Sequence, residues 1–228
     1  MVKEICNFQD FTEALRQAGM SIGGENGENV FTLCDYFGSG VAWHTEDMDT
    51  DPWEWRMRVL GECSDIAYGK FFFKKSGYIT KEWFPYFYAV RRKGLMLDEE
   101  YAEGSVSRTA VRIYKLIEEH KELPLHLMKQ YGGFTKEDKT GFDRAITELQ
   151  MKFYITMCGR AAKVSGKGTQ FGWSSTVFCR TEDFFGPEVI KFADSLDREE
   201  AYRRIEEKIY ELNPGAKPSR VRKFILGE

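Results

Sequence analysis

The chain has 228 residues, of which 42% are hydrophobic and 15% aromatic, which is enough for a packed core and excludes a disordered polypeptide. Its formal net charge of -3 excludes a globally basic coat for nucleic acid, so phosphate contacts would have to come from a local patch. The five cysteines show no C-x-x-C spacing and no signal peptide precedes them, which predicts reduced thiols in a cytoplasmic protein.

The sequence lacks the patterns that indicate a metal site, a membrane span or a common catalytic motif. The three histidines are too few and too scattered for a zinc site with these cysteines. No apolar run approaches the roughly 18–20 residues of a membrane span. Glycine-rich nucleotide motifs, G-x-S-x-G and H-E-x-x-H are also absent. We therefore expect no metal, no cofactor and no membrane contact.

Residues 1–104 are predicted to form a helical, aromatic-rich N-terminal region. Residues 8–18 place apolar side chains on one face of a helix, and the four glycines of residues 19–29 indicate a loop. After the acidic stretch at residues 46–51, Pro52 suits the first turn of a helix that Asp51 would cap. We expect this helix to continue as far as residue 75.

Two tryptophans in that helix are spaced so that they point in different directions. Trp53 and Trp55 lie two residues apart, about 200° around a helix, so they cannot both face one core. One of them is therefore expected in an interface or a pocket. The candidate pocket residues are Trp43, Trp53, Trp55, Arg56 and Trp83.

The segment after residue 78 combines aromatic side chains with a basic end. Thr80 is expected to cap a helix, and the run closes at Arg91, Arg92 and Lys93. Aromatic rings beside cations are typical of surfaces that stack bases next to phosphates. The alternative is that most of these rings belong to the core and that lysines extend over it.

Residues 105–185 are predicted to form a winged helix-turn-helix module. Apolar spacing indicates helices at 109–120, 123–131 and 135–150, after which the period changes to that of two strands near residues 153–157 and 177–179. Three helices followed by a hairpin are typical of that module. Residues 186–228 are predicted to add helices that pack on the core. The fold class is therefore mainly α with a small β-hairpin.

The predicted hairpin carries a local excess of positive charge. Residues 149–181 contain five basic residues and no acidic one, which suits contact with phosphates. The third helix has mixed charge, so a protein-binding module remains the alternative. The candidate nucleic-acid-binding residues are Lys139, Arg144, Lys152, Arg160, Lys163, Lys167, Arg91 and Arg92.

Four stretches, WHTEDMDTDPWEWR (43–56), ITKEWFPYF (79–87), ELQMKFYIT (148–156) and FGWSSTVFCRTEDFF (171–185), resemble short bacterial proteins described as AlkZ-related. These are grouped with the AlkZ-type DNA glycosylases. The resemblance implies a fold built from winged-helix modules and excision of alkylated or crosslinked bases by a Gln-aromatic-Gln motif, without a metal. No two glutamines of this chain are separated by a single residue, so the motif is absent.

Three functions follow from these observations. The first is nucleic-acid binding, with DNA as the expected partner and base-damage or crosslink repair as the context. The second is an active DNA glycosylase, which would need a group to orient water beside a stacked base. Its candidate catalytic residues are Asp51, Glu54 and His44. The third is a protein–protein interaction module.

Overall fold

The computed structural model describes residues 2–92, 94–164, 168–170 and 172–228. The helices, with one 3₁₀ turn, are α1 (Phe8–Ala18), η1 (Leu33–Tyr36), α2 (Pro52–Glu62), α3 (Phe84–Arg92), α4 (Leu97–Ala102), α5 (Arg108–His120), α6 (Leu125–Tyr131), α7 (Lys139–Met151), α8 (Thr181–Phe185), α9 (Pro187–Asp194), α10 (Arg198–Leu212) and α11 (Pro218–Leu226). The strands are β1 (Met20–Ile22), β2 (Ile66–Phe72), β3 (Lys75–Thr80), β4 (Glu122–Pro124), β5 (Ile155–Ala161) and β6 (Ser175–Arg180).

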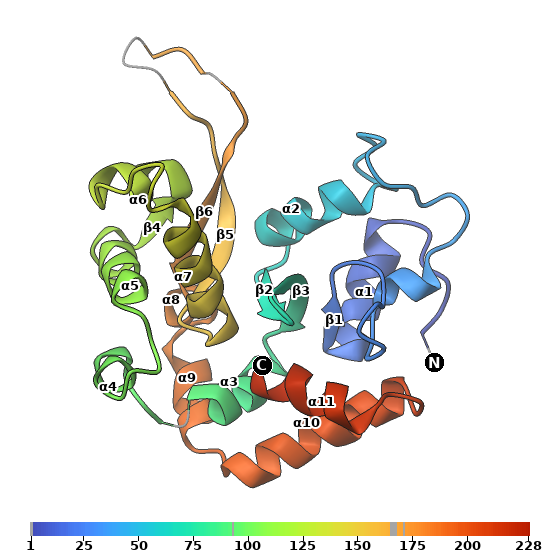
Figure 1. Cartoon of the computed structure of the whole chain (residues 1–228). Helices are drawn as coiled ribbons and strands as arrows, with labels where there is room; N and C mark the ends of the chain where they lie inside the picture. The colour runs from blue at the N-terminus through green and yellow to red at the C-terminus, as the bar shows by residue number, and fades with distance from the viewer. Residues whose placement is uncertain (1, 93, 165–167, 171) are drawn as a thin grey trace.

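The described residues contain six strands, which form one sheet in the order β1-β3-β2-β5-β6-β4, and every neighbouring pair is antiparallel (Figure 1). The pairings within β1-β3-β2 and within β5-β6-β4 each extend over several residues. The two halves are joined where Tyr68 of β2 pairs with Met157 of β5. The sheet is therefore two three-stranded parts that share a short seam.

The predicted fold class, mainly α with a small hairpin, is wrong, because the sheet has six strands and a winged-helix module is not shown. The helix that begins at Pro52 ends at Glu62, and the residues expected to prolong it form β2. Thr80 ends β3 and does not cap a helix, and part of the expected loop 19–29 forms β1.

The sequence pattern concealed β2 because that strand is buried on both sides. Ile66, Ala67 and Tyr68 are consecutive in the regularly paired part of the strand, so their side chains alternate between the two faces of the sheet, and all three are buried. Phe71 packs against Phe153, and Phe72 stacks on Phe224 with ring centroids 3.9 Å apart. Such a strand shows a continuous apolar run and no alternation, and periodicity alone cannot distinguish it from a buried helix.

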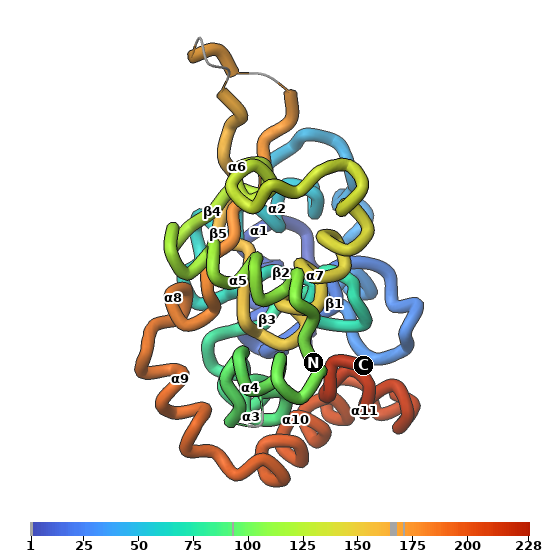
Figure 2. Tube along the Cα trace, turned by 60° about the vertical axis from the view of Figure 1, so that its left-hand side comes forward, coloured from blue at the N-terminus to red at the C-terminus, as the bar shows by residue number. Residues whose placement is uncertain are grey.

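The buried side chains form two clusters. One joins α1, α2, β1–β3 and α3 to the C-terminal helices, and the other is built from residues 97–178, mainly of α5, α6, α7 and β5. Figures 1 and 2 show α10 and α11 beside α3, which they contact, at the end of the molecule away from the β5–β6 hairpin. Within the described residues, every helix is too short or too polar to cross a lipid bilayer.

Candidate nucleic-acid interface

Asp51 organises the loop that precedes α2. Its Oδ1 accepts hydrogen bonds from the backbone N–H groups of His44 and Trp53, and its Oδ2 accepts them from Thr45 and Glu46, at 2.8–3.1 Å. The expected N-cap is thus confirmed. Burial acts to raise the pKa of Asp51, but the four N–H donors outweigh it and hold this pKa below its ordinary value. Both oxygens are already occupied, which leaves Asp51 poorly placed to orient a water molecule.

The same loop and the first turns of α2 present a row of neighbouring side chains at the surface. The Trp43 and His44 rings are 6.5 Å apart, the His44 and Trp53 rings 4.6 Å apart, and the Arg56 guanidinium carbon lies 3.1 Å from the Trp53 ring centroid. Trp43 is 42% exposed and Trp53 is 39% exposed. We call these four residues the aromatic stack. Glu54, the third catalytic candidate, is half-buried on α2, the helix that also carries Trp53 and Arg56.

The other two candidate pocket residues belong to the core. Trp55 is fully buried, which agrees with the prediction that Trp53 and Trp55 cannot both face one core, and its indole N–H donates to the Asp49 carbonyl at 3.0 Å. Trp83 is buried against Gly19, whose left-handed φ of 83° and lack of a Cβ allow the indole to approach closely. The five predicted pocket residues therefore do not share one cavity.

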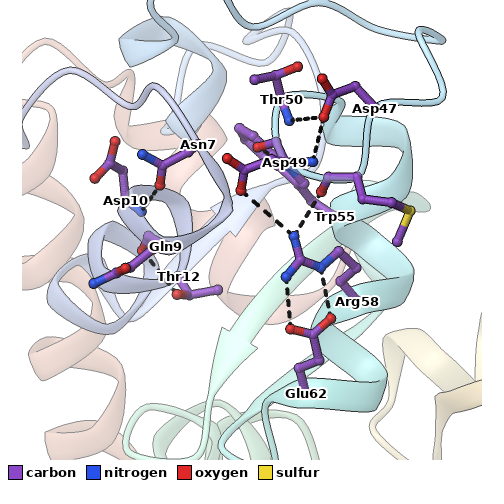
Figure 3. A network of polar contacts seen from close by, with 11 residues as sticks. Asn7, Gln9, Asp10, Thr12, Asp47, Asp49, Thr50, Trp55, Arg58 and Glu62 are labelled. Atoms are coloured by element: carbon purple, nitrogen blue, oxygen red, sulfur yellow. Dashed lines mark hydrogen bonds and ion pairs between the residues drawn. The ribbon is translucent and has the colours of Figure 1, made fainter.

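Arg58 fixes the acidic stretch against α2 (Figure 3). Its guanidinium forms two hydrogen bonds with the Glu62 carboxylate, donates to the Met48 carbonyl at 2.8 Å and lies 3.9 Å from an Asp49 oxygen. The exposed acids of this stretch therefore stay beside the aromatic stack. Their charge disfavours phosphates there, whereas uncharged faces of bases remain acceptable.

The β5–β6 hairpin and the described residues between its strands form an arm that extends beyond the body of the protein (Figure 1). At its base, Ser175 Oγ accepts a hydrogen bond from the His126 backbone N–H at 3.1 Å. Arg160 is exposed and Lys163 is half-buried, and among the described residues neither forms an ion pair. Trp173 is 91% exposed on the same arm. Lys167 lies outside the described residues.

The remaining cations divide into exposed and buried groups. Lys139 and Arg144 are exposed on α7, but Lys152 forms an ion pair with the buried Glu100 at 2.7 Å. Arg91 is buried and donates to the carbonyls of Phe71, Met151, Phe224 and Ile225. Arg92 is buried beside it in sequence. Arg91 and Arg92 therefore do not form the exposed basic surface that the sequence predicted.

The structure brings part of the predicted site together. Helix α2 packs against β5, so the aromatic stack and the arm belong to neighbouring elements, while α3 lies at the other end of the molecule (Figure 1). Trp173 was not among the predicted site residues. The sequence could have indicated Trp173, because a large aromatic residue lies there within a segment that contains glycines and no acidic residue.

The comparisons with known proteins identify the family of this chain. A family model described as AlkZ related matches residues 5–226, and the chain belongs to that AlkZ-related family. The family name links the chain loosely to DNA repair. No curated protein and no solved structure matches the chain.

Proposed function

We propose that this protein binds DNA through the arm and the aromatic stack, in a role connected with the repair of base damage. The observation that carries the proposal is the arm itself. It stands away from the body, presents Arg160 and Lys163 without a carboxylate partner among the described residues, and exposes the indole of Trp173. Cations without partners are available to replace counterions on a nucleic-acid backbone.

The two surfaces suit different parts of a nucleic acid. The arm combines positive charge with one exposed ring and suits the phosphate backbone. The aromatic stack lies beside exposed acids and offers the Trp43 and Trp53 rings, which suit unpaired bases. This division favours DNA that has an unpaired or unstacked base next to a duplex. Membership of the AlkZ-related family supports the link to damaged DNA.

The test compares two pairs of charge deletions that change the net charge equally. In the first variant Arg160 and Lys163 of the arm are replaced with alanine. In the control, alanine replaces two exposed residues, Lys217 just before α11 and Arg222 on α11. We expect the arm variant to lower the slope of log Kd against log salt by about 1–2, because each neutralised phosphate contributes roughly 0.9. The control should keep the parental slope.

The readout is fluorescence anisotropy with a labelled duplex, a labelled single strand and a duplex that contains one unpaired base. The parent should bind the third substrate more tightly than the uninterrupted duplex. Equal slopes for the two double variants would remove the arm from the interface. Failure of the parent to bind any of the three substrates would contradict DNA binding itself.

A further inference from the structure

A second site lies away from the arm, between α3, α8, α9 and the start of α10. A cavity of about 580 Å³ opens there. Its charged lining residues are Arg92, Glu182, Asp194 and Arg198, and its apolar wall includes Ile190 and Leu196. Ligand sites in proteins commonly enclose about 300–1,000 Å³ and combine an apolar wall with a few polar groups. The size and lining of this cavity fit that description.

Arg92 lacks the hydrogen-bond acceptors that a buried guanidinium normally has. It is 4% exposed, and its guanidinium forms one hydrogen bond within the described residues, from Nη2 to the Leu95 carbonyl at 3.4 Å. The described residues provide no acceptor for Nε or Nη1. The Tyr154 and Tyr88 rings lie 3.6 and 4.9 Å from its guanidinium carbon, but rings cover the faces of the group while its N–H bonds lie in the plane. Nε and Nη1 of Arg92 therefore remain without an acceptor in the part of the chain that the structure describes.

Glu182 is the complementary group in the same wall. Its Oε1 accepts a hydrogen bond from the Tyr114 hydroxyl at 3.1 Å and lies 3.9 Å from Arg180 Nη1. Its Oε2 is buried and has no donor in the part of the chain that the structure describes. Arg92 and Glu182 are not within ion-pair distance of each other. One wall thus holds a donor that lacks acceptors and an acceptor that lacks a donor.

We propose that this cavity binds a small amphoteric molecule, whose anionic group receives hydrogen bonds from Arg92 and whose N–H group donates to Glu182. The wall as a whole carries two cations and two carboxylates, so a ligand with both characters matches it better than a simple anion. Ile190 and Leu196 would contact the uncharged part of such a molecule. Both α-amino acids and nucleoside monophosphates have this chemistry, and small adjustments of Arg92 and Glu182 would bring their unsatisfied atoms to the ligand.

The binding test uses three probes with the full-length protein. L-Leucine represents the amino acids, guanosine 5′-monophosphate represents the nucleotides, and inorganic phosphate represents an anion alone. Calorimetric titration should give binding by one amphoteric probe and much weaker binding of phosphate. Arg92→Gln should raise the Kd of that probe by about tenfold or more, because hydrogen bonds to charged groups are strong. Arg222→Gln, at an exposed position of α11, is the matched control and should bind like the parent.

The place of binding is read in the unmodified protein, so the test does not depend on whether Arg92→Gln folds. Met96 lines the cavity, and its methyl resonance in protein carrying ¹³C-methyl methionine reports on that wall. The resonance is assigned with Met96→Leu. Saturable shifts of the Met96 methyl with leucine or with the nucleotide would support the proposal and identify the class. Binding of phosphate as tight as that of both amphoteric probes, a response confined to other methionines, or no binding of any probe would overturn it.

Discussion

At the scale of single residues, Asp51 shows how the structure changes a prediction made from the sequence. Asparagine is nearly as good as aspartate at an ordinary N-cap, so Asp51→Asn would be expected to cost little. In the folded protein, however, each carboxylate oxygen accepts two backbone N–H groups. An amide would place its NH₂ group against two donors. We therefore expect Asp51→Asn to lower the free energy of unfolding by about 2–3 kcal/mol.

Chemical denaturation at several pH values tests this account of Asp51. The folded pKa of Asp51 lies below its ordinary value, so its carboxylate stabilises the fold fully above about pH 3.9. That contribution is lost as the pH falls through the folded pKa. The difference between parent and Asp51→Asn should therefore be constant near neutral pH and shrink in acid. A difference near zero at pH 7 would show that the loop does not depend on the carboxylate.

Trp173 gives a prediction that separates binding from folding. Because its side chain is 91% exposed, Trp173→Ala should change the free energy of unfolding by less than about 0.5 kcal/mol. If the ring stacks on a base, the same change should weaken DNA binding by about 1–3 kcal/mol and leave the salt slope unaltered. Anisotropy titrations and urea unfolding measure the two effects. Tyr101→Ala, at a 43% exposed ring on α4, should affect neither quantity appreciably.

At the scale of elements, the sequence predicted amphipathic helices well and buried strands poorly. The expected helix at 8–18 coincides with α1, and the one at 109–120 agrees with α5 to within one residue. Their apolar residues recur on a single face, which periodicity detects. Strand β2 was missed because six of its seven residues are buried, and β3 because its last four residues are all buried, so neither strand shows an alternating pattern. Strand β4 has only three residues, too few for a pattern.

The candidate site was predictable only where neighbours in sequence become neighbours in space. Trp43, His44, Trp53 and Arg56 lie on one loop and the helix that follows it, and they form the aromatic stack. Charge composition, by contrast, does not report burial. Arg91 and Arg92 looked like a basic surface, but contacts with distant elements enclose both side chains. The division into residues 1–104, 105–185 and 186–228 stays a prediction.

At the scale of the whole molecule, Arg91 connects parts that the sheet joins only at its seam. Its donors reach the carbonyls of Phe71 in β2, of Met151 in α7, and of Phe224 and Ile225 in α11, at 2.6–2.8 Å. Burial lowers the pKa of Arg91 to about 9, so the group is still charged at neutral pH. One cation thus satisfies four backbone acceptors drawn from both halves of the structure.

Replacing Arg91 should therefore weaken the connection between the two halves as well as overall stability. Arg91→Met keeps much of the apolar volume but leaves buried carbonyls without a donor, and we expect a loss of about 3 kcal/mol or more. Urea unfolding can be followed by far-UV circular dichroism, which reports on the whole chain, and by tryptophan fluorescence. Four of the five tryptophans lie in residues 43–83, so fluorescence reports mainly on the first half. In Arg91→Met the two transitions should no longer coincide. Arg16→Met is the control, since the exposed Arg16–Asp65 pair contributes at most about 1 kcal/mol. If both variants unfold in one coincident transition with similar midpoints, Arg91 is not the connection between the halves. The short seam at Tyr68 and Met157, with its surrounding core, must then be sufficient to make the two halves unfold together.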